Sequence, residues 1–545
     1  MEFSSMRINN ALKEAVFLLI VCFLIFFIFS SRTSITYELS EDESYYIVTG
    51  NTGSKIKSLT IPAEYEGKPV KEIAQGAFAD FDKLKEVNLP DSIEIIGKSA
   101  FYGCTALESI AIPEGVKTID PYAFFGCTAL KSAILSEGLE YIDEYAFANC
   151  TSLGEISIPA STYNLGFSAL GGCTALENIE VAASNPNYKS VDGNLYNKDA
   201  TVLLQYAAGK DSPSFNLPSS VITVGDFALR GAKNLVSVQL TGNLLEIGEC
   251  AFIGCTSLSN ITLPESLEKI GKSAFHTCKA LTTINIPERV YEIGQSAFFR
   301  CSTLEEIVVD EDNLTYSSIN GSLYDKNAEI MKQYAPGKTD FTFTIPNSVR
   351  FIDDFAFAWC THLVSVVLPE DLVRINTNAF QHCYKLIEVV NKSNLDIVKG
   401  GDNHGAVALY ADNVISDASK SKLSISNGEN FIFYNNGEEL YLMGAAADKA
   451  LVIAPSNYNG QSYVIYDYCF YSQDGAKDVS IPLMSIVEWL VFDSGDGVFF
   501  DCSELESIII SDLNLPIPKF LSDIILKIDN RTCYTDEYDV VVAEK

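Results

Sequence analysis

One stretch decides the fold: Gly97-Lys-Ser-Ala-Phe-Tyr-Gly-Cys104-Thr-Ala-Leu107-Glu-Ser-Ile110-Ala-Ile112-Pro113-Glu-Gly-Val116-Lys-Thr-Ile119, after which the same pattern begins again. Its cysteine recurs every 23 residues within three runs, and these ladder cysteines are Cys104, Cys127, Cys150 and Cys173, then Cys255, Cys278 and Cys301, then Cys360 and Cys383. A leucine follows each of them by three positions, an alanine precedes each by four, and a phenylalanine precedes each by three, except at Leu170. A unit this short cannot bury its own apolar side chains. The period therefore predicts coils that stack and share one interior.

Each unit is expected to hold one short strand. From Leu107 to Ile112 the spacing is L-x-x-L-x-L, as in a leucine-rich repeat, with Ile110 and Ile112 pointing inward and Ser109 pointing outward. Pro113 lacks an amide donor, so it suits the end of the strand. We therefore expect a mainly β protein with short 3-10 or helical turns. Its fold is a leucine-rich-repeat solenoid of 23-residue coils, capped at both ends.

The pattern I-P-x-x-V-x-x-I-G-x-x-A-F-x-x-C-x-x-L resembles the BspA-type leucine-rich repeat family, a group of cell-surface and secreted repeat proteins. The resemblance is strong over roughly residues 55 to 390 and returns around Cys469 and Cys502. It implies a surface protein that binds other proteins, in adhesion to host or neighbouring-cell proteins. The alternative is a structural or envelope-organising spacer with no specific ligand.

A second periodicity shows that part of the chain is a duplicated block. The irregular stretch with Asp192-Gly193 returns later in the chain around Asn320-Gly321, and both stretches enlarge a coil. These dipeptides supply the positive φ that a tight hairpin turn needs, so each stretch is expected to form a strand pair. The pair is interpreted either as a protruding edge that contacts a partner or as a longer coil that packs on itself. The tyrosines of the edge are Tyr188, Tyr196, Tyr206, Tyr316, Tyr324 and Tyr334.

The N-terminus indicates export. Residues 15–29 are apolar without interruption and follow Arg7 and Lys13. This length suits a hydrophobic helix that is either a cleaved signal peptide or an uncleaved membrane anchor. We expect a protein at the cell surface or outside the cell, with no membrane contact beyond this segment.

Charge narrows the choice of partner. The chain has 38 basic and 71 acidic residues, a formal net charge of −33. This surplus repels nucleic acid and anionic lipid. An extracellular protein with a cationic or neutral surface is the expected partner, a neutral glycan is possible, and the chain is expected to be a monomer.

The ladder cysteines are expected to be reduced thiols in the core. Successive coils lie ~4.8 Å apart, which would permit a disulfide, but parallel side chains in a packed interior favour small apolar thiols. Disulfides and a metal site are the alternatives. Because a catalytic Cys-His pair needs an exposed thiolate, the proximity of His276, His362 and His382 to ladder cysteines is not taken as an active site. No enzyme activity, cofactor or metal is expected.

The strands together present an outward surface, on which the binding residues are sought. It is polar to mildly acidic, with an apolar patch toward its later coils at Val308, Val367 and Val390, and it lacks the tyrosine, tryptophan and arginine typical of hot spots. The alternative is a solvated face without a ligand. The candidate contact residues are Ser109, Glu155, Asn178, Glu180, Asn260, Thr262, Thr283, Asn285 and Glu306.

The expected domain organisation follows the period. Residues 1–34 are the signal peptide or anchor, and residues 35–60 are an N-terminal cap. The solenoid spans 61–390, with longer coils at 182–218 and 310–346. An irregular insert with β-hairpins covers 391–465, and degenerate repeats with a C-terminal cap cover 466–545.

Overall fold

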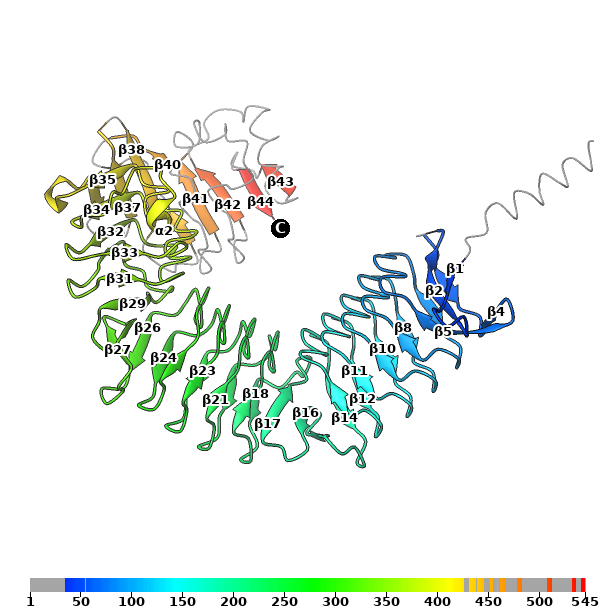
Figure 1. The fold of residues 1–545 in the computed structure, drawn as a ribbon. Coiled ribbons are helices and arrows are strands. Elements are labelled where there is room, and N and C mark those ends of the chain that lie inside the picture. Colours follow the sequence, from blue (N-terminus) through cyan, green and yellow to red (C-terminus); the bar gives the residue numbers. More distant parts are fainter. Residues whose placement is uncertain are drawn as a thin grey trace, which may run out of the picture. The chain divides into compact units, whose positions relative to one another are not determined.

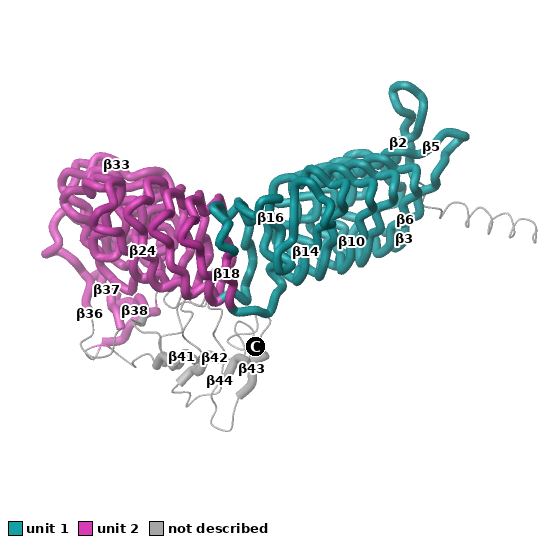
Figure 2. Tube along the Cα trace, turned by 90° about the horizontal axis from the view of Figure 1, so that it is seen from below, with its two compact units in different colours: residues 1–213, 218–235 teal, residues 214–217, 236–545 magenta. Residues whose placement is uncertain are grey.

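The chain divides into two compact units. Unit 1 is Met1–Pro213 with Pro218–Leu235, and unit 2 is Ser214–Leu217 with Val236–Lys545 (Figure 2). The structure is a computed structural model. It describes residues 35–53, 55–425, 431–437, 439–445, 451–453, 458, 461–465, 478–482, 507–511, 532–535 and 541–544. The expected hydrophobic helix at 15–29 and most of the expected C-terminal cap lie outside these residues. Within the described part of the chain, no helix is both long enough and apolar enough to cross a membrane.

The solenoid of 23-residue coils is confirmed in unit 1, where strands of successive coils lie side by side (Figure 1). One ladder is a parallel sheet whose register advances by one coil from strand to strand, for example from Ser109 to Ser132 to Glu155. Each of its strands buries a residue between two outward ones, as Ile110 is buried between Ser109 and Ala111. Its strands are β3 (Ser58–Thr60), β6 (Glu86–Asn88), β8 (Ser109–Ala111), β10 (Ser132–Ile134), β12 (Glu155–Ile158) and β14 (Asn178–Val181).

A second ladder corrects the expectation of one strand per coil. The turn after the proline leads into another strand, which after the first coil is only two residues long and pairs in parallel with its counterpart in the next coil, as Thr118 does with Tyr141. Ile119 and Ile142 point inward from it and are buried. Its strands are β5 (Lys68–Ile73), β7 (Ile95–Ile96), β9 (Thr118–Ile119), β11 (Tyr141–Ile142) and β13 (Asn164–Leu165).

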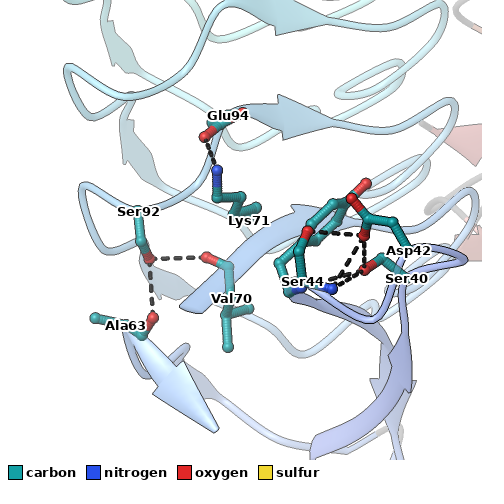
Figure 3. Close-up of polar contacts among 9 residues, drawn as sticks. Ser40, Asp42, Ser44, Ala63, Val70, Lys71, Ser92 and Glu94 are labelled. Carbon is teal, nitrogen blue, oxygen red and sulfur yellow. Dashed lines mark hydrogen bonds and ion pairs between the residues drawn. The ribbon is translucent and has the colours of Figure 1, made fainter. Parts of the chain in front are cut away.

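An antiparallel hairpin stands before the first coil. It is formed by β1 (Ile35–Leu39) and β2 (Tyr46–Asn51), and β2 pairs in parallel with β5, against which β4 (Glu64–Tyr65) also pairs. Figure 3 shows the polar contacts here: Asp42 accepts hydrogen bonds from the Ser40 and Ser44 hydroxyls at 2.8 and 2.7 Å. The bonds from Ser44 are the main reason that the pKa of Asp42 falls to about 2. These bonds close the hairpin loop.

Phenylalanine and cysteine fill the interior. The rings of Phe101, Phe124 and Phe147 are fully buried and stack with centroids 5.2 and 5.1 Å apart. Each ladder thiol for which a bond is seen donates to the carbonyl of the phenylalanine one coil further back, as Cys127 Sγ does to Phe101 O at 3.3 Å. The ladder cysteines are free thiols and all are buried. Burial raises the pKa of the Cys104 thiol to about 12.

Unit 2 repeats both ladders. The strands of its first ladder form three separate sheets. The first contains β18 (Ser214–Asn216), β20 (Ser237–Gln239) and β22 (Asn260–Ile261), the second contains β24 (Thr283–Ile286) and β26 (Glu306–Val309), and the third contains β30 (Thr342–Thr344), β32 (Ser365–Leu368), β34 (Glu388–Asn391) and β35 (Asn413–Ile415). Its second ladder includes β21 (Glu246–Ile247), β23 (Lys269–Ile270), β25 (Glu292–Ile293), β31 (Phe351–Ile352) and β33 (Arg374–Ile375).

The two longer coils are three-stranded meanders. In unit 1, β15 (Tyr188–Val191) and β16 (Asn194–Asn197) form the predicted strand pair, and β17 (Val202–Gln205) then returns to pair in parallel with β19 (Thr223–Val224). In unit 2 the equivalent strands are β27 (Tyr316–Ile319), β28 (Ser322–Asp325) and β29 (Ile330–Gln333). Both predicted turns are confirmed, because φ is 48° and 69° at Asp192-Gly193 and 50° and 72° at Asn320-Gly321.

The strands after residue 420 cover part of the outward surface. After α2 (Asn403–Ala406) and the 3-10 turn η1 (Ala418–Lys420), strands β36 (Leu423–Ile425), β37 (Phe431–Asn435) and β38 (Leu440–Ala445) pair antiparallel. Ile432, Tyr434 and Met443 pack in one cluster with Val364 and Ile387 of the last coils. The remaining strands are β39 (Leu451–Ile453), β40 (Val464–Ile465), β41 (Asp478–Pro482), β42 (Ser507–Ser511), β43 (Thr532–Thr535) and β44 (Val541–Glu544).

The covering strands explain why the outward row, which is exposed in the earlier coils, is buried in the last coils. Ser365 and Glu388 stand in the row of Ser109 but are each only 1 % exposed. Glu388 accepts hydrogen bonds from Ser421 Oγ at 2.7 Å and from Asn413 Nδ2 at 2.9 Å. Of the apolar patch expected on the surface, Val367 and Val390 are therefore buried, at 7 % and 2 % exposure, whereas Val308 is 40 % exposed. The sequence could not show this cover, because the period is lost in the segment that provides it.

Candidate functional site

The outward strand positions of unit 1 lie where the sequence predicts. Ser109, Glu155 and Glu180 are exposed and Asn178 is half-buried. Asn178 Nδ2 donates to Glu180 Oε1 at 3.3 Å, and Ser157 Oγ donates to Glu180 Oε2 at 3.4 Å. This face is a regular row of small polar and acidic groups.

The outward positions of unit 2 are of the same kind. Its candidate contact residues are all exposed, and they are Asn260, Thr262, Thr283, Asn285 and Glu306. The register places Thr283 beside Glu306 and Asn285 beside Val308. Their role as contacts stays a prediction.

The tyrosine contacts predicted for the longer coils are wrong for four of the six residues. Tyr196 and Tyr324 are 0 % exposed, and Tyr206 and Tyr334 are 2 % and 1 % exposed. The third strand of each meander returns to the solenoid, and this path carries the tyrosines inward. Because these rings fill the interior, they cannot reach a partner in the folded protein. The longer coil packs on itself.

The other two tyrosines act within the solenoid. Tyr316 is 8 % exposed and Tyr188 is half-buried. The hydroxyl of Tyr316 accepts a hydrogen bond from the amide of Ile293 at 2.9 Å, and Tyr188 does the same for Leu165. Each hydroxyl thereby supplies the acceptor that the next coil's strand would otherwise provide.

Unit 2 carries a surface that was not expected, which we name the unit 2 aromatic ridge. Its residues are neighbours along one edge of the coils, and all are half-buried: His276, Phe299, Arg300, Phe355, Trp359, His382 and Tyr384. The Arg300 guanidinium lies over the Trp359 ring at 3.9 Å, and the Trp359 and His382 rings are 4.4 Å apart. Tryptophan, arginine and tyrosine are the residue types enriched at interface hot spots.

The ridge stands on a strained backbone. The residue before each ladder cysteine commonly adopts positive φ, and in unit 1 it is often glycine, as at Gly103 and Gly126. In unit 2 the same position holds Arg300, Trp359 and His382, with φ of 59°, 64° and 62°. A residue with a Cβ costs roughly 1–2 kcal/mol there. Positive φ at residues other than glycine recurs along the coils of both units, as at Tyr122 and Asn149, so the stacked repeat imposes it, and what is specific to the ridge is the size of the side chains at this position.

Arg300 sets the charge of the ridge. Burial, and then the charge of Arg300, lower the pKa of His276 to about 4, and the same two causes lower the pKa of His382. His382 Nδ1 lies 2.6 Å from the Tyr384 hydroxyl. At neutral pH both imidazoles are therefore uncharged, and Arg300 supplies the positive charge.

Unit 1 has a related row of aromatic rings without tryptophan. The rings of Tyr102 and Phe125 stack at 5.2 Å, and those of Tyr122 and Tyr145 stack at 5.1 Å. Both rows were missed from the sequence because contacts were expected on the outward strand positions and on the longer coils, and not at the turns around the ladder cysteines. The signal was present: aromatic residues recur one, two or five positions before a ladder cysteine or its counterpart.

The arrangement of thiols and imidazoles is unlike that of a catalytic pair. The pKa of the Cys278 thiol is raised well above its ordinary value by burial, while the pKa of the nearby His276 is lowered. A nucleophilic cysteine needs the opposite shifts, which favour thiolate and imidazolium. Among the described residues, no group of three or more histidine, cysteine or acidic side chains could hold a metal ion.

Comparisons with known proteins agree with the repeat. A family model described as the BspA type leucine rich repeat region matches in six copies, over residues 52–191, 207–330 and 338–401. A search of curated proteins found no match.

Three solved structures illustrate the likeness. The chain is similar to a leucine rich cell surface protein from Faecalibacterium prausnitzii A2-165, at 24% identity and TM-score 0.43, over 62% of this chain and 93% of that one. It is similar to the pneumococcal vaccine antigen PcpA at 20% identity and TM-score 0.48, over 71% and 98% of the two chains. A leucine-rich repeat protein from Bacteroides ovatus ATCC 8483 has 26% identity and TM-score 0.41, over 66% and 93%.

Proposed function

This chain belongs to the BspA-type leucine-rich repeat family, and on that premise we propose that it is an exported protein, displayed at the cell surface, that binds other proteins in adhesion. The apolar segment 15–29 directs its export, as a signal peptide or as an anchor. Family membership and the net charge of −33 support a partner with a cationic or neutral protein surface.

One observation carries the binding proposal: the unit 2 aromatic ridge combines Trp359, Arg300 and Tyr384, and Arg300 and Trp359 occupy positions of positive φ, which side chains rarely adopt. A solenoid with rigid coils presents such a ridge without ordering a loop on binding, which lowers the entropic cost of association. The strand-face candidates, among them Ser109 and Glu155 in unit 1 and Asn260 in unit 2, are proposed as further polar contacts, each within its own unit.

Binding is tested with the full chain on a panel of immobilised purified extracellular proteins. We expect saturable binding to at least one of them, and Trp359→Gly should weaken it at least about tenfold, as truncation of a hot-spot tryptophan does. Glycine suits the positive φ of Trp359, so this variant tests the ring and not the turn. Leu314, which is 85 % exposed in unit 2, provides the control as Leu314→Ala.

Two results would overturn the proposal. Absence of binding by the wild-type chain across the panel would favour the structural spacer. Equal binding by wild type and Trp359→Gly would show that the unit 2 aromatic ridge does not contact the partner.

Export is tested by brief protease treatment of intact cells. Release of peptides from residues 60–390 is expected, since the solenoid is proposed to face outward. Retention of all such peptides in intact cells, with release only after lysis, would contradict surface display.

A further inference from the structure

A cavity of ≈ 270 Å³ opens in unit 2 where the longer coil rejoins the second ladder. Phe298, Tyr316 and Leu323 give it apolar walls, and Lys332, Gln333 and Asp354 give it polar ones. It adjoins the unit 2 aromatic ridge in sequence, since Phe298 precedes Phe299 and Asp354 precedes Phe355. Small-molecule sites usually measure about 300–1,000 Å³, so this cavity suits one side chain better than a larger ligand.

The charges of the cavity leave one carboxylate available. Lys332 Nζ forms an ion pair with Asp353 Oδ2 at 2.8 Å, and Asn376 Nδ2 donates to Asp353 Oδ1 at 3.4 Å. Lys332 and Asp353 therefore largely neutralise each other. None of the residues that the structure describes donates a side-chain or backbone hydrogen bond to the Asp354 carboxylate. The cavity has a net negative charge that resides on Asp354.

A buried amide supplies a second acceptor. Gln333 is 5 % exposed, and its Nε2 donates to Tyr334 O at 2.9 Å and to Ala356 O at 3.2 Å. These two carbonyls fix the orientation of the amide, because only its nitrogen can donate to them. Across residues 35–53 and 55–425, no donor reaches Gln333 Oε1. Gln333 lines the cavity, and its Oε1 is therefore available there as a hydrogen-bond acceptor.

The duplicated block shows which features are specific to unit 2. The positions of Tyr316, Gln333 and Asp354 hold Tyr188, Gln205 and Asp226 in the first copy, so these residue types are the same in both. Gln295, Lys332 and Asp353 correspond instead to Phe167, Leu204 and Gly225. In unit 1 the ring of Phe167 lies 5.2 Å from that of Phe227. The second copy has exchanged these groups for polar ones around a shared scaffold.

We propose that this cavity receives an arginine side chain of the partner protein, an inference that rests on the proposed function. A guanidinium has five donors and no acceptor, which matches the Asp354 carboxylate and Gln333 Oε1. Its apolar stem would lie against Ile293, which lines the cavity and is half-buried. The acidic chain attracts a basic partner, and arginine is enriched at hot spots, so the cavity anchors the partner beside the ridge.

The inference is tested by saturation-transfer NMR with the full chain and N-acetyl-arginine amide as the probe. N-acetyl-citrulline amide, which has the same shape without the charge, is the matched control ligand. We expect transfer to the arginine probe only, and Asp354→Asn should weaken its binding at least about tenfold. The matched protein control is Asp226→Asn, the same substitution in the first copy, which should leave binding unchanged.

A second variant separates electrostatics from damage to the fold. Lys332→Met frees Asp353 from its ion pair and should strengthen binding of the arginine probe several-fold, whereas a misfolded cavity would weaken it. Equal binding by wild type and Asp354→Asn, equal binding of citrulline, or no transfer at all would overturn the arginine site. In that case saturable binding of the wild-type chain to the protein panel would leave the proposed function standing. Absence of panel binding would refute that function separately.

Discussion

Replacement of Phe124 by alanine probes the shared interior most sharply. Its ring is 0 % exposed and lies between those of Phe101 and Phe147, with centroids 5.2 and 5.1 Å away and planes within 6° and 5°. Buried Phe→Ala changes cost about 3–5 kcal/mol, and each aromatic contact adds roughly 0.5–1.5 kcal/mol beyond area. Since two ring contacts are lost at once, we expect a decrease in the free energy of unfolding of about 4–5 kcal/mol.

The assay is urea unfolding followed by far-ultraviolet circular dichroism. The matched control is Tyr102→Ala, because the Tyr102 ring stacks on Phe125 at 5.2 Å but is 37 % exposed. Stacking is thus similar and burial differs, so this control should cost about 1 kcal/mol. The reasoning is refuted if Phe124→Ala costs no more than Tyr102→Ala, since burial between coils would then contribute nothing.

Three further predictions concern pH and the covering strands. Burial raises the pKa of the Cys104 thiol from its ordinary value of 9.0 to about 12. The stability that this thiol contributes is therefore complete below pH 9 and is lost as the pH rises toward 12. A midpoint of urea unfolding that stays constant between pH 9 and 12 would contradict this prediction. The pKa of His276 is lowered from 6.5 to about 4, so its contribution to the free energy of unfolding is complete above pH 6.5 and is lost as the pH falls toward 4. The variant His276→Phe should make the urea midpoint less sensitive to acid. An unchanged dependence of the urea midpoint on pH would contradict this prediction. Glu388→Ala removes the acceptor of hydrogen bonds from Ser421 and Asn413. This change should lower the free energy of unfolding by about 3 kcal/mol and speed tryptic cleavage at Lys422. Cleavage at the wild-type rate would show that Glu388 does not hold the covering strands.

Much of the fold could be predicted because the repeat leaves few alternatives. A phenylalanine and a cysteine at a fixed distance in every unit can be buried only if the units stack. The turns at Asp192-Gly193 and Asn320-Gly321 could also be predicted, since positive φ is a local property of these residues. The second ladder could not, because a two-residue strand such as Thr118–Ile119 is too short to show alternation.

The candidate site was harder to predict than the fold. The exposure of Ser109 and Glu155 follows from strand alternation, and the structure agrees. The inward direction of Tyr196 and Tyr324 depends on a third strand that returns to the solenoid, which no local pattern indicates. The tyrosines of the longer coils suggested surface contacts, because those coils break the period. In the structure, four of the six tyrosine rings are buried in the interior instead.

The ridge and the cavity depend on contacts between coils. Arg300 and Trp359 are far apart in sequence, yet the guanidinium lies 3.9 Å from the ring centroid. The longer coil between them is what makes them neighbours, and its path had to be known first. The cavity near Asp354 also depends on contacts between coils. Its lining comes from residues 293–298, from the longer coil and from Asp353 and Asp354 of the coil after it.

Thiol modification with residue-level mass spectrometry tests the central claim, that successive coils within each unit enclose an interior of phenylalanine and cysteine. The full chain is treated with N-ethylmaleimide at pH 7 without reductant, once folded and once in urea. Because the ladder cysteines are at most 2 % exposed and are free thiols, we predict that all nine are unmodified in the folded chain and modified in urea. Modification of the ladder cysteines in the folded chain, or their protection in urea, would contradict the account.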